Sequence, residues 1–444
     1  MNEPTRAVDF HRVLAALSLA VASHGAGCAR THDDLQGPDA PLLERKVRVG
    51  LLTPLSGAAA AEGASTLRGA QLAVERINSQ GGVLVKDESG RMLLELLTGD
   101  TRTTPAEGAA AAAKLVTQDR VDVVAGGFSS AVTLAAQSAI AARRTPFLIG
   151  GASTPQVTRR TDVDTSWMFH YFGIGPHHGK AMARFLAEAV RPRLAPERAL
   201  RVALIYQDTA FGQDFREGLP GLGLVGWARA EKLPLEFVAD EKFPLGATDF
   251  RRPLKAIQAA RPDVIVPIAL GEETLAILRQ GIEELGIESL WGPAAIPVET
   301  PHSIQALGRL NDRLTIATYF SPYDTPRGAV DPVAREFRAE FEKRFGEAPG
   351  ASAANHYDSM FILKRAIEDA GSLEKARVRD ALERLDMPAL SIPVEGGRIR
   401  FDGHHEVRFE MFVTQLVRDA AGGETRAKVI WPPEHANAEL RLPR

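Results

Sequence analysis

The sequence predicts an α/β fold in which mostly parallel sheets are flanked by helices. Two observations lead to this prediction: short apolar runs typical of buried strands alternate with helical patterns, and the alternation occurs twice along the chain. Strands that alternate with helices form βαβ units, in which the strands are parallel. The two series, at residues 46–155 and 202–291, are therefore expected to form two units of similar architecture.

The first series predicts strands that end in polar loops. We expect strands at residues 47–52, 92–97, 121–125 and 146–149, with helices at residues 67–77, 106–118 and 131–142 between them. The loops carry small, hydroxyl-bearing residues, at Ser56-Gly57, Ser129-Ser130 and Ser153-Thr154. In an open α/β sheet, ligands bind beyond the carboxyl ends of the strands. These loops are therefore predicted to line one binding cleft.

The second series follows a loop-rich stretch at residues 156–175. We expect a helix at residues 180–190, then strands at 202–206, 235–237, 264–269 and 289–291, with helices at 212–218, 249–260 and 272–285. The last third departs from the alternation. It predicts a strand at 314–320, helices at 331–345, 353–369 and 373–385, and a β-hairpin between residues 398–401 and 407–417, turning at Asp402-Gly403.

Composition and charge narrow the class of protein. The chain has 444 residues, of which 45% are hydrophobic and 25% charged, as in soluble globular proteins. This length suffices for two or more domains. A formal net charge of −3 and a pI near 6.4 supply no basic footprint for nucleic acid. Charge therefore argues against DNA or RNA as the partner.

The N-terminal segment has the order of residues found in a secretory signal. Arg6 and Arg12 precede a short apolar run at residues 13–23, and small residues at 25–27 lead to Cys28, the only cysteine. A cysteine in this position resembles the lipidation site of bacterial lipoproteins, although Gly25 stands where leucine is usual. We expect residues 1–27 to be removed and Cys28 to be acylated; the alternative is an ordinary signal peptide with an incidental cysteine.

The rest of the N-terminal region predicts a tether outside the cytoplasm. Residues 28–45 contain little to bury and are expected to link the acylated cysteine to the folded body. The apolar run at 13–23 is shorter than the roughly 20 residues that span a bilayer. We therefore expect a protein of the periplasm or outer cell surface that meets the membrane only through its anchor.

Five motifs in order carry a family resemblance: VGLLTPLSG, RGAQLAVERINSQGGV, Asp100 after the second strand, VDVVAGGFSS and TPFLIGGASTPQVT. From about residue 46 to residue 433 the chain resembles the type I periplasmic binding proteins of ABC importers, the leucine/isoleucine/valine-binding group. The resemblance implies a small-molecule ligand bound between two lobes, hinge closure, ABC permease subunits as partners, and a monomer.

The resemblance also implies that the chain crosses between the lobes three times. The crossings are expected near residues 173–176, 321–325 and 387–391. Lobe 1 would then comprise residues 46–174 and 325–387, and lobe 2 residues 175–324 and 388–434. The sequence alone supports these positions only as loops.

The strongest candidate site combines two loops of the first series. Ser129 and Ser130 open a predicted helix, where hydroxyls and free backbone N–H groups bind anions such as a carboxylate. Plain capping of the helix is the alternative. Ala152 and Ser153, which follow the next strand, favour ligand binding. In the amino-acid binders that the chain resembles, these loops hold the α-carboxylate and amine of the ligand, and Ser130 and Ser153 match.

Further candidates come one by one from the other strand ends. Glu62 could bind a cation in the cleft, or it could be a solvated glutamate at the first turn of a helix. Phe211 matches a tyrosine that covers the ligand in relatives, and Tyr357 matches a tyrosine near their cleft; packing is the alternative for both. Tyr171 and Leu270 are expected to add to the apolar wall of the cleft.

An expected acid is missing from lobe 2. Amino-acid binders of this group fix the α-ammonium of the ligand with an acidic residue after a strand and a Gly-Pro, and the matching segment here, after Gly292-Pro293, begins with Ala294 and Ala295. A buried ammonium without a counter-charge is costly. We therefore expect a small carboxylate with an apolar or aromatic body ahead of an unmodified aliphatic amino acid, unless Glu62 substitutes.

The chain shows no pattern of a catalytic, cofactor or metal site. Two histidine clusters, His170 with His177-His178 and His404-His405, lack metal-ligand spacing and are expected in surface loops. No GxSxG or Walker A motif occurs, so we expect neither an enzyme nor a cofactor. Two rival functions stay open: a sensor module of the same fold, and an envelope hydrolase.

Overall fold

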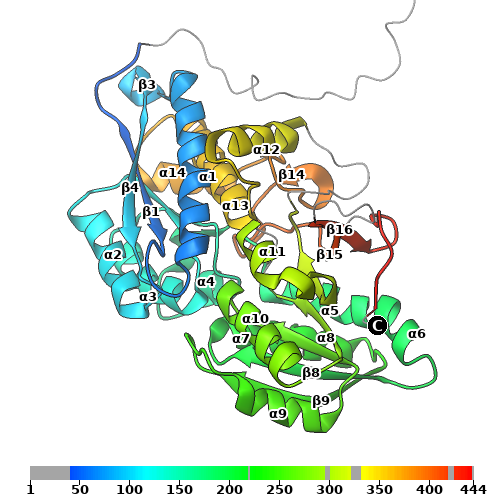
Figure 1. Cartoon of the computed structure of the whole chain (residues 1–444). Helices are drawn as coiled ribbons and strands as arrows, with labels where there is room; N and C mark the ends of the chain where they lie inside the picture. The colour runs from blue at the N-terminus through cyan, green and yellow to red at the C-terminus, as the bar shows by residue number, and fades with distance from the viewer. Residues whose placement is uncertain (1–40, 219–220, 296–300, 322–331, 419–424, 443–444) are drawn as a thin grey trace, which may run out of the picture. The chain divides into compact units, whose positions relative to one another are not determined.

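The first of two main sheets consists entirely of parallel strands. The computed structural model describes residues 41–218, 221–295, 301–321, 332–418 and 425–442. The strand order of this sheet is β4-β1-β5-β6-β7. Figure 1 shows β1 beside β4. Its elements are β1 (Val47–Thr53), α1 (Ala60–Ser79), β4 (Leu94–Asp100), α2 (Pro105–Thr117), β5 (Val123–Gly126), α3 (Ser130–Ala142), β6 (Phe147–Ile149) and β7 (Met168–His170). The strands and helices predicted for the first series are confirmed to within a few residues, except that α1 begins earlier than the pattern indicates.

The second sheet is larger and of mixed direction. Its order is β16-β15-β12-β11-β10-β8-β9; β15 runs antiparallel to both β12 and β16, whereas the pairs from β12 to β9 are parallel. Its strands are β8 (Leu200–Gln207), β9 (Leu235–Phe243), β10 (Val264–Ile268), β11 (Leu290–Ala294), β12 (Leu314–Thr318), β15 (Phe412–Arg418) and β16 (Thr425–Trp431). Its helices include α5 (Gly175–Phe185), α7 (Ala210–Arg216), α8 (Leu224–Ala230), α9 (Arg251–Ala260), α10 (Gly271–Leu278) and α11 (Pro301–Leu307). The predicted α/β class with mostly parallel sheets is confirmed.

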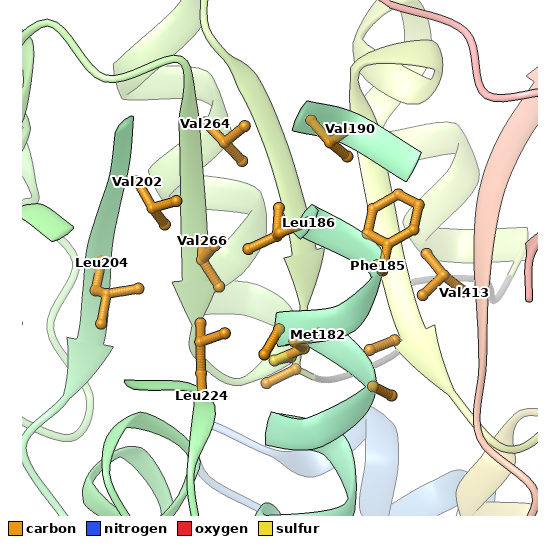
Figure 2. Close-up of a cluster of buried hydrophobic side chains, with 14 of the residues drawn as sticks. Met182, Phe185, Leu186, Val190, Val202, Leu204, Leu224, Val264, Val266 and Val413 are labelled. Atoms are coloured by element: carbon orange, nitrogen blue, oxygen red, sulfur yellow. The ribbon is translucent and has the colours of Figure 1, made fainter. Parts of the chain in front are cut away.

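The second sheet is buried on both faces. Figure 2 shows Val202, Leu204, Val264 and Val266 of β8 and β10 directed toward Met182, Phe185 and Leu186 of α5 and the helical turn that follows it. The alternate strand residues Ala203, Ile205 and Ile265 pack on the opposite face with Leu254 and Ile257 of α9. Side chains of a strand point alternately to its two faces. Continuous apolar runs are therefore what a sheet covered on both faces requires.

Two predictions for the connecting segments are wrong. Residues 398–401 do not form a hairpin with residues 407–417: β14 (Arg398–Ile399) pairs with β13 (Met387–Pro388), and β15 pairs with β12 and β16. The turn at Asp402 exists, since the Asp402 N–H donates to the Glu406 carbonyl at 3.0 Å. The loop-rich stretch at 156–175 contains β7, which pairs with β6 at the edge of the first sheet.

Segments late in the sequence return to the first sheet. After α12 (Pro332–Phe345), α13 (Ala351–Ala370) lies along α1 and beside β5, and α14 (Lys375–Glu383) packs on α13. The approach to α1 is close enough to require glycine at residue 69, where a Cβ would stand 2.1 Å from the Ala353 carbonyl oxygen. Residues 401–409 contact β7: the rings of Phe169 and His405 stack 4.4 Å apart, and His170 pairs with Glu406.

The membrane-related expectations rest on residues outside the described ranges. The signal segment, Cys28 and most of the tether precede residue 41. Among the helices that the structure describes, none has both the length and the apolar character needed to cross a bilayer.

Candidate functional site

The loops after β5 and β6 lie against each other at the carboxyl edge of the first sheet. The Ala152 N–H donates to the Phe128 carbonyl at 2.9 Å, and Ala152 has a positive φ of 61°. A Cβ at Gly151 would stand 1.9 Å from the Gly127 carbonyl oxygen, so this approach needs glycine. The structure therefore brings the Ser129-Ser130 and Ala152-Ser153 loops together.

Ser130 is the most informative residue of this edge. Its side chain is 1% exposed, and its Oγ has no hydrogen-bond partner. Ser129 occupies the N-cap position of α3, yet its side chain makes no capping hydrogen bond. A buried hydroxyl without a partner costs roughly 1–3 kcal/mol. Buried polar groups are nearly always paired, so this hydroxyl at a helix N-terminus calls for a partner from outside the chain.

The Ser153-Thr154 loop connects the first sheet to helices of the second. The Ser153 carbonyl accepts the Gly175 N–H at 2.8 Å, at the start of α5. The Thr154 hydroxyl donates to the carboxylate of Asp214 on α7. Burial raises the pKa of Asp214 to about 6, although hydrogen bonds from Thr154 and Gln156 oppose the shift. Sequence reasoning missed Asp214, because nothing local distinguishes it from a solvated aspartate of a helix.

Glu62 makes a second connection between the two sheets. It lies in the first turn of α1, and its carboxylate lies against Gly271 at the start of α10, where a Cβ would stand 2.6 Å from Oε1 of Glu62. Glu62 is partly exposed as a residue, but its Oε2 is shielded from solvent and has no hydrogen-bond partner. Burial raises the pKa of the Glu62 carboxyl, and Glu272 and Glu273 raise it further. Glu62 thus lies against the start of α10, with part of the residue still exposed to solvent.

An apolar wall adjoins these polar groups. Phe211 is 4% exposed and Leu270 is 5% exposed, and both belong to the apolar cluster of the second sheet. The rings of Phe211 and Phe215 meet edge to face at 5.1 Å. Phe128 comes from the β5 loop and packs against the same cluster, a contact that sequence reasoning missed. Ala295, in the segment after Gly292-Pro293, also belongs to this apolar cluster.

The two predicted tyrosines are packed within the protein. Tyr171 is fully buried, and its hydroxyl donates to Oδ2 of Asp358 at 2.8 Å. Tyr357 is fully buried too, with its ring 4.5 Å from that of Phe337 and 5.1 Å from that of Phe361. Burial raises the pKa of both hydroxyls. Both tyrosines therefore make the contacts of core side chains. For Tyr357, packing was the alternative to a place near the cleft.

The expectation that the histidines lie in surface loops is wrong for His170 and His178. Both are buried: Nε2 of His170 lies 2.7 Å from the Ala152 carbonyl oxygen, and Nδ1 of His178 lies 3.1 Å from that of Ile174. Burial lowers the pKa of His178 to about 4. Within the described ranges, no three His, Cys, Asp or Glu side chains gather in a way that could hold a metal ion.

Comparison with known proteins gives a consistent result. Residues 46–423 match the family described as periplasmic binding protein. A Leu/Ile/Val-binding protein homolog of Brucella abortus (strain 2308) is 23% identical over 439 residues, which cover 96% of this chain and 98% of that protein.

Two solved structures share the fold. A leucine-binding protein of Thermotoga maritima superposes with a TM-score of 0.72 at 23% identity, covering 87% of this chain and 99% of that one. A solute-binding protein of an R. palustris ABC transporter, in complex with benzoate, gives a TM-score of 0.70 at 18% identity, covering 90% and 99%. With the parallel sheets and the polar loops at their carboxyl edge, these matches establish the type I fold, and the chain belongs to the periplasmic binding protein family.

Proposed function

We propose that this protein is the extracytoplasmic solute-binding component of an ABC importer, and that it binds a small carboxylate or amino-acid-like ligand between its two lobes. The observation that carries the proposal is the unpartnered Ser130 hydroxyl at the N-terminus of α3, beside the Ala152-Ser153 loop. Backbone N–H groups at a helix N-terminus and a free hydroxyl together suit a carboxylate. Relatives named for leucine and benzoate both bind ligands with a carboxylate group.

The ligand would be enclosed by residues of both lobes. Ser129, Ser130, Ala152 and Ser153 would hold the carboxylate on lobe 1, while Phe211 and Leu270 of lobe 2 would cover the apolar body. The location of Tyr171 and Tyr357 in the core supports a structural role for them instead. The ligand would contact both lobes only when they are closed about the hinge, so binding would shift the population from the open to the closed form.

We propose lobes close to those implied by the family, with one adjustment. The family resemblance implies lobe 1 at residues 46–174 and 325–387, and lobe 2 at residues 175–324 and 388–434. Residues 401–409, however, contact β7 of the first sheet, and the rings of Tyr171 and Phe409 meet at 5.1 Å. We therefore propose that the third crossing lies just before β15, later than residues 387–391.

Membership of the family implies an extracytoplasmic location, and we propose a lipid anchor at Cys28 as its means of retention. The short apolar run and the small residues before the only cysteine support this. The remaining parts of the proposal are a monomeric protein, delivery of the ligand to membrane-bound permease subunits, and binding without turnover.

Native mass spectrometry of the protein as purified tests the ligand class. A retained mass that matches a small carboxylate or amino acid, and that is lost on mild unfolding, is expected. Calorimetry then separates leucine, isoleucine and valine from aromatic and short-chain carboxylates. If no member of either group binds to the folded protein, the proposed ligand class is wrong.

A further inference from the structure

A cavity of about 460 Å³ lies beside the start of α5, outside the proposed cleft. Its walls come mainly from α5, α8, residues 395–411 and the end of β16. Among the described residues that line it, none belongs to the Ser130 loop or to the apolar wall of the cleft. Small-molecule sites usually have volumes of roughly 300–1,000 Å³. The cavity is therefore large enough for a ligand of its own.

Two indole rings form part of the wall, and the protein binds the N–H of each. Nε1 of Trp227 on α8 donates to the Pro176 carbonyl at 3.2 Å, and Nε1 of Trp431 donates to Oε2 of Glu188 at 3.2 Å. Met411 adds a third apolar side chain to the lining. Because the polar atoms of both rings are engaged within the protein, the rings offer a ligand only their carbon surface. This part of the wall suits a planar, apolar body.

Four cationic side chains of the described chain line the same cavity, and two of them are neutralised by an acid. Arg159 donates twice to the buried carboxylate of Glu406, at 3.1 and 2.6 Å. Arg184 donates to Oε1 of Glu188 at 2.8 Å, one turn further along the helix. These two pairs are balanced in charge and help to shape the wall.

The other two cations, Lys180 and Arg408, are exposed where the cavity meets solvent. Within the described ranges neither forms an ion pair, and the one acid of the lining, Glu395, is also unpaired. His177 adds no charge near pH 7, because burial lowers its pKa to about 4. Two unpaired cations against one unpaired acid leave one positive charge in excess. It lies next to an aromatic surface, since Nζ of Lys180 is 4.8 Å from the centroid of the Trp227 ring.

We propose that this cavity binds a small aromatic anion, with its ring against Trp227 and Trp431 and a single anionic group at Lys180 and Arg408. The guanidinium fork of an arginine matches the oxygens of a carboxylate, sulfonate or phosphate, and the ammonium adds a second donor. The inference goes beyond the proposed function and does not depend on it, because the cavity and the cleft share no lining residue.

Fluorine NMR of the protein labelled with 5-fluorotryptophan tests this inference, because the chain contains four tryptophans. Titration with naphthalene-2-sulfonate is expected to move the resonances of Trp227 and Trp431 alone, and Trp227→Phe and Trp431→Phe assign them. Trp291 is fully buried and reports on the core. The Trp167 ring lies 5.0 Å from the guanidinium carbon of Arg379, so its resonance reports unspecific attraction of the anion to a surface arginine.

The charge requirement is tested by one variant and one neutral analogue. Arg408→Gln should weaken the binding of naphthalene-2-sulfonate by about tenfold or more, as the loss of a charge-assisted hydrogen bond implies. Naphthalene-2-sulfonamide, which has the same shape and no charge, should bind the wild type more weakly by a similar factor. Arg252→Gln is the matched control, because Arg252 is also exposed and lies on α9, across the second sheet from α5. It should bind the sulfonate as the wild type does.

Spectra without ligand that match the wild type would show that both variants fold. If the resonance of Trp167 moves as far as those of Trp227 and Trp431, or if none of the three moves, the inference is overturned. The same holds if the sulfonamide binds as tightly as the sulfonate, or if Arg408→Gln has no effect, because charge then plays no part. These outcomes leave the proposed function untouched, since that concerns the cleft at Ser130.

Discussion

The hydroxyl of Tyr171 donates a hydrogen bond of 2.8 Å to Oδ2 of Asp358, and both residues are fully buried. Oδ1 of Asp358 accepts the Ser391 N–H at 3.0 Å. One turn earlier on α13, Asn355 accepts the Tyr319 hydroxyl at 2.9 Å and donates to the Tyr171 carbonyl at 3.0 Å. One face of α13 thereby fastens three segments of chain, which follow β7, β12 and β13 and lie at or near the expected crossings.

Loss of the Asp358 carboxylate is expected to destabilise this junction. Asp358→Ala leaves the Tyr171 hydroxyl and the Ser391 N–H buried without partners, and we expect a loss of about 2–4 kcal/mol in the free energy of unfolding. Urea unfolding followed by circular dichroism measures it. Asp369→Ala on the same helix is the control: its exposed ion pair with Arg365 should contribute less than about 1 kcal/mol. Equal effects of the two changes would contradict a special role for Asp358.

Ser130→Ala is expected to weaken ligand binding by about tenfold or more with little change in melting temperature. The Ser130 hydroxyl makes no hydrogen bond within the protein, so its removal breaks no internal hydrogen bond. Ser153→Ala should also weaken binding by about tenfold, which calorimetry with the ligand identified by mass spectrometry would measure.

Thr104→Ala provides the comparison for plain helix capping. The Thr104 hydroxyl accepts the Glu107 N–H at the start of α2. Its loss should lower stability by about 1 kcal/mol and leave affinity unchanged. If Ser130→Ala behaves like Thr104→Ala, Ser130 serves only the helix.

Asp214 is expected to make stability depend on pH. Burial raises its pKa to about 6, above the value of about 3.9 in an unfolded chain. The folded state therefore binds this proton more tightly, so the Asp214 contribution to stability is complete below about pH 4 and declines as pH rises to about 6. In Asp214→Asn, the decline in the free energy of unfolding from low to neutral pH should be smaller than in the wild type by about 1–3 kcal/mol. Urea unfolding of both proteins at pH 4.5, 5.5, 6.5 and 7.5 measures the difference.

Asp208→Asn is the control for this pH series. Asp208 is an exposed aspartate in the neighbouring loop, and its hydrogen bond with Lys242 lowers its pKa instead. The variant should not reduce the decline between pH 4 and 6. If the stability of Asp214→Asn declines with pH as much as that of the wild type, Asp214 is not the source of the decline.

Cys28 is expected to be acylated after cleavage between Gly27 and Cys28. Metabolic labelling with an alkyne fatty acid should mark the wild-type protein and not Cys28→Ala, because the thiol is the site of attachment. Mass spectrometry of the mature N-terminus provides the second measurement. Labelling of the Cys28→Ala variant to the wild-type level would remove the lipoprotein prediction.

The sequence was sufficient to predict the strands that form the centre of each sheet. Runs such as residues 47–53 are mostly apolar, with Arg48 as their one exposed residue, because both faces of a parallel sheet are covered by helices, and this signal is local. The polar loops at the strand ends were predictable for the same reason, since each follows its strand directly. Their approach to one another then follows from parallel strand order, which the alternation with helices indicates.

Only the tertiary structure decided which distant residues meet. The pairing of β15 with β12, the hydrogen bond from Thr154 to Asp214 and the contact of Glu62 with Gly271 each join segments far apart in the chain. The same is true of the burial of His170 and His178. A single sequence carries no local pattern for such contacts, because their free energy comes from desolvation and packing between elements that become neighbours only in the folded chain. The strand ends and Glu62 were therefore predictable as candidates for a site, whereas the contact of Glu62 with Gly271 became apparent only in three dimensions.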